Sequence, residues 1–176
     1  MNVYVIYENE DWMSPLRTAL DAAGVPYEEW FVDEGHFEVT SAPPEGIFLN
    51  RMSASSHTRG HTAAVAHTRQ LIAWLERSGR RVVNGSRAFE LEMSKVQQHA
   101  ALQQAGLRTP ATRAVAGGEE ALLTAAEDMP TPFVTKHNRG GKGLGVQLFR
   151  TQAAFRGAVR SGEIPTPPAH ITLLQQ

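Results

Sequence analysis

The chain has 176 residues, which is enough for one large domain or two small ones. Its formal net charge of -1 argues against nucleic-acid binding through a general basic excess. It has no cysteine, which excludes a disulfide framework, thiolate chemistry and a cysteine-type zinc site. No apolar run approaches the roughly 20 residues of a membrane-spanning helix, and the first residues lack a basic signal region. The composition therefore predicts a soluble, cytoplasmic, globular protein.

Strands and helices alternate through the first half of the chain. Four short apolar runs predict strands, at residues 3–7, 27–32, 46–49 and 81–84. A helix is expected to begin with Ser14 as its cap and Pro15 at its first position, and to end at Gly24. A longer helix is expected over residues 61–78. Strands separated by such helices predict a mainly parallel sheet covered on both faces, in a first domain of residues 1–84.

The second domain is predicted to cover residues 85–176. Three helices are expected, at 94–105, 119–127 and 151–160. Strands are expected at 112–115, on either side of a glycine-rich turn at 133–136 and 146–149, and at 170–176. The last strand ends with the chain, whereas termini normally lie at frayed surface positions, so we expect a chain that is cut short.

The most informative stretch of the sequence is residues 131–146, where an apolar strand ends in Lys136 and a glycine-rich turn follows. The glycines and further cations of this turn are Arg139, Gly140, Gly141, Lys142, Gly143 and Gly145. Glycines packed this densely let backbone N–H groups face an anion without interference from Cβ atoms. The pattern predicts a flap that binds polyphosphate, with a merely flexible hairpin as the alternative.

Three common phosphate-binding motifs do not match this stretch. A P-loop needs Ser or Thr directly after its lysine, but Lys142 is followed by Gly143. A Rossmann fingerprint would follow the first strand, but residues 8–11 contain no glycine. The glycine spacing of a kinase loop is not matched by Gly141, Gly143 and Gly145, and neither H-R-D nor D-F-G follows.

Several positions together carry a resemblance to a known superfamily. They are Arg51, Asn84, Lys95, the Gly106…Pro110…Thr112 passage, Lys136, the turn 140–146 and the final residues 173–176. Their order resembles the ATP-grasp superfamily, and within it the RimK-like glutamate ligases, over nearly the whole chain. The resemblance implies an α/β fold. A parallel-sheet preATP-grasp domain would be followed by the first, flap-bearing α+β lobe of an ATP-grasp fold, with the second lobe missing.

The resemblance also implies a nucleotide site. Its members would be Lys95, Lys136, Gly140, Gly141, Lys142, Gly143, Gly145, Gln175 and Gln176. The first two lysines would approach the ATP phosphates from two sides, as compact positive charges. The glycine N–H groups would close over the β- and γ-phosphates, and the two glutamines would begin the adenine-binding edge. The carboxylate usual in these proteins at position 176 is a glutamine in this chain.

The reaction implied is the ligation of a carboxylate to an amine through an acyl-phosphate formed from ATP. The substrates would be an amino acid such as glutamate and a peptide or small molecule, with ATP and Mg²⁺ as cofactors. The magnesium ligands of the family, an Asp and a Glu-x-Asn set, are expected beyond Gln176, so the chain alone is expected to be inactive. A homo-oligomer is left open, whereas neither nucleic acid nor a membrane is an expected partner.

Two other functions are compatible with the same residues. One is a nucleotide-binding or interaction module that has lost catalysis. The other is an ATP-grasp ligase of another branch, similar to D-alanine ligases or glutathione synthetases. Whether the native chain continues past Gln176 into an Asp and a Glu-x-Asn set would separate the enzyme from the module.

Arg51 and two histidines are further candidates for site residues. Arg51 ends a predicted parallel strand, where α/β sheets bind ligands, and could pair with a substrate carboxylate; a surface ion pair is the alternative. His57 and His61 have a spacing that suits a metal site on a helix, but Ser55 and Gly60 favour a polar loop. The resemblance implies that this loop faces the nucleotide cleft.

Overall fold

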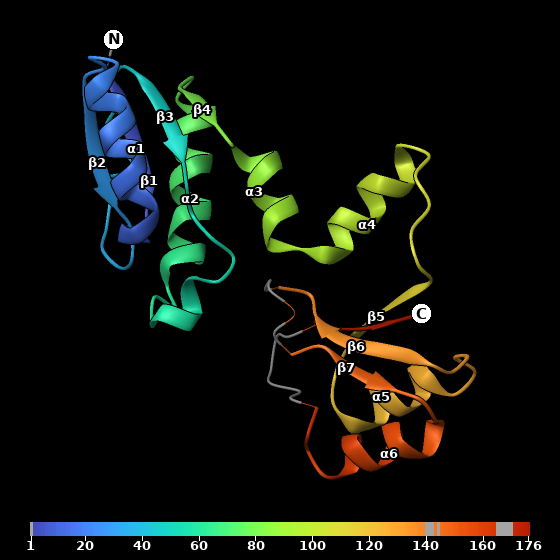
Figure 1. Ribbon diagram of the computed structural model, residues 1–176. Helices are drawn as coiled ribbons and strands as arrows, with labels where there is room; N and C mark the ends of the chain where they lie inside the picture. Colours follow the sequence, from blue (N-terminus) through green and yellow to red (C-terminus); the bar gives the residue numbers. More distant parts are fainter. Residues whose placement is uncertain (1, 140–142, 144, 165–170) are drawn as a thin grey trace. The chain divides into compact units, whose positions relative to one another are not determined.

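The computed structural model describes residues 2–139, 143, 145–164 and 171–176 (Figure 1). The chain divides into two compact units, Met1–Met93 and Ser94–Gln176. The boundary predicted from the sequence lay after Asn84. The difference is the helix α3 (Ser86–Met93), which we had not expected and which belongs with the first unit.

The first unit is built on a parallel sheet with the strand order β2-β1-β3-β4. Its strands are β1 (Val3–Tyr7), β2 (Tyr27–Phe31), β3 (Ile47–Asn50) and β4 (Arg81–Val83). Its other helices are α1 (Glu10–Ala22), the short 3₁₀ helix η1 (Ser56–Arg59) and α2 (Ala64–Arg77). Because the described pairings between these strands are all parallel, the strands end at one common edge.

Alternate residues of β1 build two cores, one on each face of this sheet. Tyr4 and Ile6 pack with Phe48 and the buried side of α2, while Val5 and Tyr7 pack with Met13 of α1. This alternation follows from the two-residue period of a strand. The sheet is therefore covered on both faces, as the sequence predicted.

The second unit contains an antiparallel sheet with the strand order β5-β8-β6-β7. Its strands are β5 (Thr112–Ala116), β6 (Phe133–His137), β7 (Gln147–Phe149) and β8 (Ile171–Gln175). Its helices are α4 (Lys95–Gln104), α5 (Glu119–Ala126) and α6 (Gln152–Arg160). The helices α5 and α6 cover one face of the sheet (Figure 1).

Three phenylalanines fill the core between this face and the two helices. Phe155 of α6 lies 5.1 Å from Phe133 and 5.2 Å from Phe149, measured between ring centroids. Leu174 of β8 joins the same core. Its neighbours Leu173 and Gln175 therefore point to the opposite face of the sheet, which is the face that carries Lys136.

The start of α1 differs from the prediction. The helix begins at Glu10 rather than after Ser14, and Pro15 lies inside it. Asn9 is the cap, with extended backbone and a side-chain oxygen that accepts a hydrogen bond from the N–H of Asp11 at 3.1 Å. The acidic residues Glu10 and Asp11 also suit the positive end of the helix dipole.

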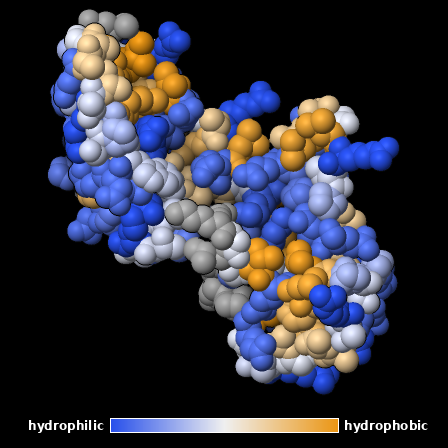
Figure 2. All heavy atoms as spheres, in the orientation of Figure 1, coloured by the Kyte–Doolittle hydropathy of each residue, from blue (hydrophilic) through white to orange (hydrophobic). Residues whose placement is uncertain are grey.

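Hydrophilic side chains dominate the surface seen in Figure 2, with small hydrophobic patches between them. The large exposed hydrophobic residues are Trp12, Phe31, Val39, Val83, Leu102, Leu107, Val146 and Leu148. Within the described residues, no helix combines the length and the apolar character needed to cross a bilayer.

Gly46 lies just before β3, in a position where a side chain has no room. Its φ is +156°, and a Cβ atom there would lie 2.5 Å from the carbonyl oxygen of Asn2 and 2.8 Å from the ring of Tyr4. Gly46→Ala should lower the free energy of unfolding of the first unit by more than about 2 kcal/mol, since backbone strain and a clash add together. All three tryptophans lie in this unit, so urea unfolding followed by their fluorescence measures the change.

Gly24 provides the matched control. Its φ of +62° is also left-handed, but a Cβ atom there would meet nothing within 4 Å. Gly24→Ala should therefore cost only the backbone term, about 1 kcal/mol. Equal losses in the two variants would contradict the proposed clash at Gly46.

Candidate functional site

A pocket of about 390 Å³ opens in the first unit, at the carboxyl end of its parallel sheet. Its walls come from the ends of β3 and β4, from α1 and from α3. The lining residues are Trp12, Asn50, Arg51, Met52, Ser53, Asn84, Ala88, Phe89 and Glu92. The place agrees with the rule that open parallel sheets bind ligands beyond their carboxyl ends.

Two asparagines tie the ends of β3 and β4 together at this pocket. The side-chain amide of Asn50 donates to the backbone carbonyl oxygen of Asn84 at 3.0 Å. The side-chain amide of Asn84 donates in turn to the backbone carbonyl oxygen of Asn50 at 3.1 Å. Asn84 has a φ of 56°, a left-handed conformation that asparagine adopts more readily than most residues. The side-chain oxygen of Asn50 also accepts from the N–H of Met52. These bonds fix the backbone on either side of Arg51.

Arg51 lies at the carboxyl end of β3, as the sequence predicted. Its N–H donates to the carbonyl oxygen of Ile6 at 2.8 Å, which extends the pairing with β1 by one residue. Its guanidinium group donates to the carbonyl oxygen of Trp12 at 3.4 Å. Its guanidinium and the carboxylate of Glu92 line one pocket, which therefore offers both signs of charge.

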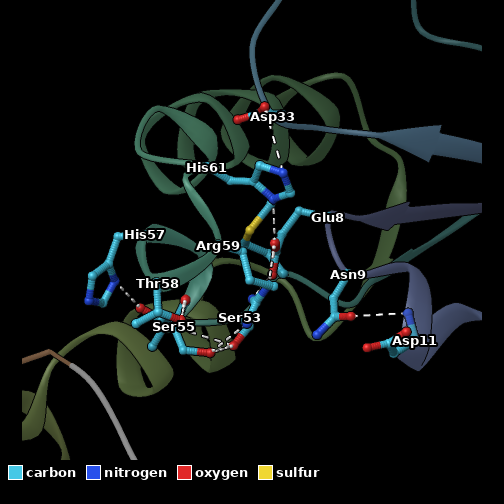
Figure 3. A network of polar contacts seen from close by, with 12 residues as sticks. Glu8, Asn9, Asp11, Asp33, Ser53, Ser55, His57, Thr58, Arg59 and His61 are labelled. Carbon is cyan, nitrogen blue, oxygen red and sulfur yellow. Dashed lines mark hydrogen bonds and ion pairs between the residues drawn. The ribbon is translucent and has the colours of Figure 1, made fainter. Parts of the chain in front are cut away.

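A buried carboxylate anchors the loop that follows β3 (Figure 3). The side chain of Glu8, just after β1, is fully buried and contacts Nη2 of Arg59. Its other oxygen lies 3.1 Å from Nε of Arg59 and 2.8 Å from Nδ1 of His61. The other ring nitrogen of His61 lies 3.8 Å from the carboxylate of Asp33. A buried carboxylate needs such partners, because removing a charge from water is costly.

The two histidines of this loop have separate roles. Nδ1 of His57 lies 3.2 Å from the carbonyl oxygen of Ala54, whereas His61 contacts Glu8. Among the residues that the structure describes, no group of three His, Cys, Asp or Glu side chains could hold a metal. The polar loop expected from Ser55 and Gly60 is confirmed, since η1 is short and Gly60 adopts a left-handed φ of 88°.

Sequence reasoning missed Glu8. It lies 51 residues before Arg59 and 53 before His61, in an acidic run that looks like an exposed turn. The one available signal was its place directly after a buried parallel strand, at the edge where site residues gather.

The pairing of Glu8 with Arg59 yields a stability prediction. Arg59→Ala leaves the buried carboxylate with His61 alone, so the free energy of unfolding of the first unit should fall by about 3 kcal/mol. Urea unfolding followed by tryptophan fluorescence measures the loss.

Arg69→Ala is the control for this prediction. The Arg69–Glu90 ion pair lies in the same unit, but its side chains are 44% and 31% exposed. Its loss should therefore cost less than about 1 kcal/mol. An equally small loss in Arg59→Ala would show that Glu8 does not depend on its arginine.

A second group of polar side chains lies on the face of the antiparallel sheet that α5 and α6 leave uncovered. Lys136 of β6 donates to the side-chain oxygen of Gln175 on β8 at 2.6 Å. The amide nitrogen of Gln175 lies 2.7 Å from the hydroxyl of Thr112 on β5 and 3.0 Å from Nε2 of His99 on α4. Burial lowers the pKa of Lys136, and the ammonium group of Lys95 lowers it further.

Asn138, just after β6, holds the start of α4 beside this group. Its carbonyl oxygen accepts from the N–H of Lys95 at 2.9 Å, and its side-chain oxygen accepts from the N–H of Val96 at 2.9 Å. Ser94 is the helix cap, as predicted, with its hydroxyl oxygen 3.3 Å from the N–H of Gln97. These contacts bring Lys95 close enough to Lys136 to affect its pKa.

The remaining residues of the predicted nucleotide site are placed only in part. Gly143 and Gly145 have φ values of 72° and 70°. A Cβ atom on Gly145 would lie 2.6 Å from the ring of His137, so a side chain at this position would require that ring to move. The backbone N–H of Gln176 donates to the carbonyl oxygen of Ala111 at 3.0 Å. Gly140, Gly141 and Lys142 lie outside the described residues.

No protein-family model matches the sequence, and no curated protein sequence matches it. Solved structures do match the fold. A RimK domain ATP-grasp protein from Sphaerobacter thermophilus is 23% identical with a TM-score of 0.67, over 98% of this chain and 63% of that one. D-cycloserine synthetase is 17% identical with a TM-score of 0.63, over 99% of this chain and 59% of that one. D-alanine–D-alanine ligase from Bacillus anthracis is 16% identical with a TM-score of 0.66, over 100% of this chain and 56% of that one.

These similarities show that the chain has an ATP-grasp fold similar to that of a RimK domain protein. The predicted fold class, a parallel-sheet domain followed by an α+β lobe of this fold, is confirmed. The chain spans less than two thirds of the length of each of these three structures.

Proposed function

We propose that this chain is the ATP-binding portion of a ligase that joins a carboxylate to an amine. The observation that carries the proposal is the pair of lysines formed by Lys95 at the start of α4 and Lys136 on β6. Burial lowers the pKa of Lys136, and the nearby ammonium group of Lys95 lowers it further, so a positive charge at this position is unfavourable. A polyphosphate bound beside the two lysines would offset that cost.

In this proposal the chain contributes binding and orientation. Lys95 and Lys136 neutralise the phosphates of ATP, while Gly143 and Gly145 let the backbone turn its N–H groups toward them. Gln175 and Gln176 begin the edge at which the adenine binds. ATP supplies the phosphoryl group that activates the carboxylate. Since the described residues offer no cluster that could hold Mg²⁺, we assign no metal ligand to them.

The carboxylate substrate is proposed to bind in the pocket of the first unit. The guanidinium group of Arg51 can donate two parallel hydrogen bonds to a carboxylate. Arg51 lies at the strand ends that are fixed by Asn50 and Asn84. The pocket volume of about 390 Å³ suits a group the size of an amino acid. A RimK-like ligase that adds an amino acid such as glutamate is the reaction that we favour.

The similarity to a D-alanine–D-alanine ligase supports a second candidate. Its TM-score of 0.66 is close to the 0.67 of the RimK domain protein, so an ATP-grasp ligase of that branch fits the fold nearly as well. The two candidates differ in their acceptors, and a screen of amino acids and peptides with the full gene product distinguishes them.

Lys136→Ala should weaken ATP binding about ten- to a hundredfold, because a hydrogen bond to a charged group contributes roughly 1.5–3 kcal/mol. Isothermal titration calorimetry with ATP and Mg²⁺ measures the change. Arg160→Ala is the control, since it removes the same charge from α6, on the other face of the sheet. Undiminished affinity in Lys136→Ala would remove this lysine from the site.

Arg51→Gln should abolish the binding of free amino acids that compete for the carboxylate site, because the bidentate contact is lost. Trp12 lines the same pocket, so tryptophan fluorescence reports binding there. Arg81→Gln, at the first residue of β4 and the far end of the sheet from the pocket, should leave the titration unchanged. Amino-acid binding that survives in Arg51→Gln would place the carboxylate elsewhere.

A further inference from the structure

Gln175 is the centre of a hydrogen-bond chain whose direction can be derived from its members. Lysine only donates hydrogen bonds, so the side-chain oxygen of Gln175 must accept from Lys136. Its amide nitrogen therefore points the other way, with two protons to donate. One is directed to the hydroxyl oxygen of Thr112, and the other to Nε2 of His99.

The environment of Thr112 agrees with that direction. The hydroxyl of Thr112 donates its own proton to the carbonyl oxygen of Pro110 at 3.0 Å, which leaves its oxygen free to accept from Gln175. Nε2 of His99 can accept only if it carries no proton, so the proposed direction puts the proton of the neutral ring on Nδ1, a buried atom for which the described residues offer no acceptor. Burial lowers the pKa of His99, and Lys136 lowers it further, so the ring is neutral at pH 7.

We propose that His99 and Thr112 are positioning residues for the nucleotide site, because they lock the amide of Gln175 in the one orientation that presents its oxygen to Lys136. The inference rests on the proposed function, in which Lys136 binds a phosphate of ATP. With the amide reversed, an NH₂ group would face the ammonium group, and Lys136 would lose its acceptor. Gln175 is buried, so little water can reach its own amide group in either orientation.

The chain of hydrogen bonds makes the site sensitive to acid. A proton on His99 turns Nε2 into a donor, which then faces the donor amide of Gln175. The amide reverses, and Lys136 is released from its position. The charged group that bears on His99 is Lys136, which lowers the pKa of the ring further after burial, and Lys95 bears in turn on Lys136. ATP affinity should therefore fall below neutral pH through His99.

The tautomer of His99 tests the chain of bonds without nucleotide. Long-range ¹H–¹⁵N correlation spectra of the ¹⁵N-labelled chain at pH 7.5 should show a neutral His99 with its proton on Nδ1. His99→Gln identifies the signals. A proton on Nε2, or a charged ring at this pH, would overturn the proposed direction.

Variants then test the positioning role by ATP titration calorimetry. His99→Leu should weaken ATP binding about tenfold, as expected for one lost polar contact behind a charged group. His99→Gln, whose side-chain oxygen can accept from Gln175, should restore affinity to within about threefold of the unmodified chain. On a Lys136→Ala background, His99→Leu should have no further effect, because His99 acts through Lys136.

The pH profile adds a readout that packing alone would not change. As the pH falls from 7.5 through the lowered pKa of His99, ATP affinity should fall more steeply in the unmodified chain than in His99→Gln. ATP itself takes up a proton in this range, and the comparison between the two chains removes that contribution. Parallel profiles, or additive losses in the double variant, would overturn the positioning role. ATP binding that is absent from the unmodified chain would instead overturn the proposed function, and the tautomer would still decide the direction of the bonds.

Discussion

A charge removed from water must be met by an opposite charge or by hydrogen bonds, and this constraint organises both units. In the first unit it is satisfied within the chain, because Glu8 is matched by Arg59 and His61. In the second unit, the charge of Lys136 is compensated only in part. Among the described residues, the partly buried Lys136 donates to the neutral amide of Gln175, and its charged neighbour Lys95 repels it. The first arrangement stabilises a loop, and the second suits the binding of an anion.

The same contrast separates the two lysines, which we propose for the nucleotide site, from Glu8, which stabilises a loop. Glu8 is enclosed, and its partners hold the loop that leads from Arg51 to α2. Lys136 is only partly buried, and the side chain of Gln175 fixes its position without neutralising it. Such a group keeps its capacity to interact with a ligand. Preorganised charge of this kind is what phosphate chemistry requires from a protein.

The sequence predicted those parts of the fold that depend on local signals. Strand alternation, the Ser94 cap and the lysine at the end of β6 follow from residues close together in the chain, and the structure contains them. The start of α1 was predicted wrongly because Pro15 suggested a first turn, while the capping residue is Asn9. The contacts that define the site were not predicted. The Gln175–His99 bond joins residues 76 positions apart, and no local pattern indicates such a pairing.

The repulsion between Lys95 and Lys136 has a thermodynamic consequence for any anion that binds beside them. Burial, and after it the ammonium group of Lys95, make Lys136 bind its proton less tightly than an ordinary lysine does. A bound anion reverses this, so in alkaline solution the site takes up a proton from the buffer as the anion arrives. The measured heat of binding then contains the ionisation heat of the buffer. Anion binding at this position is therefore coupled to proton uptake by Lys136.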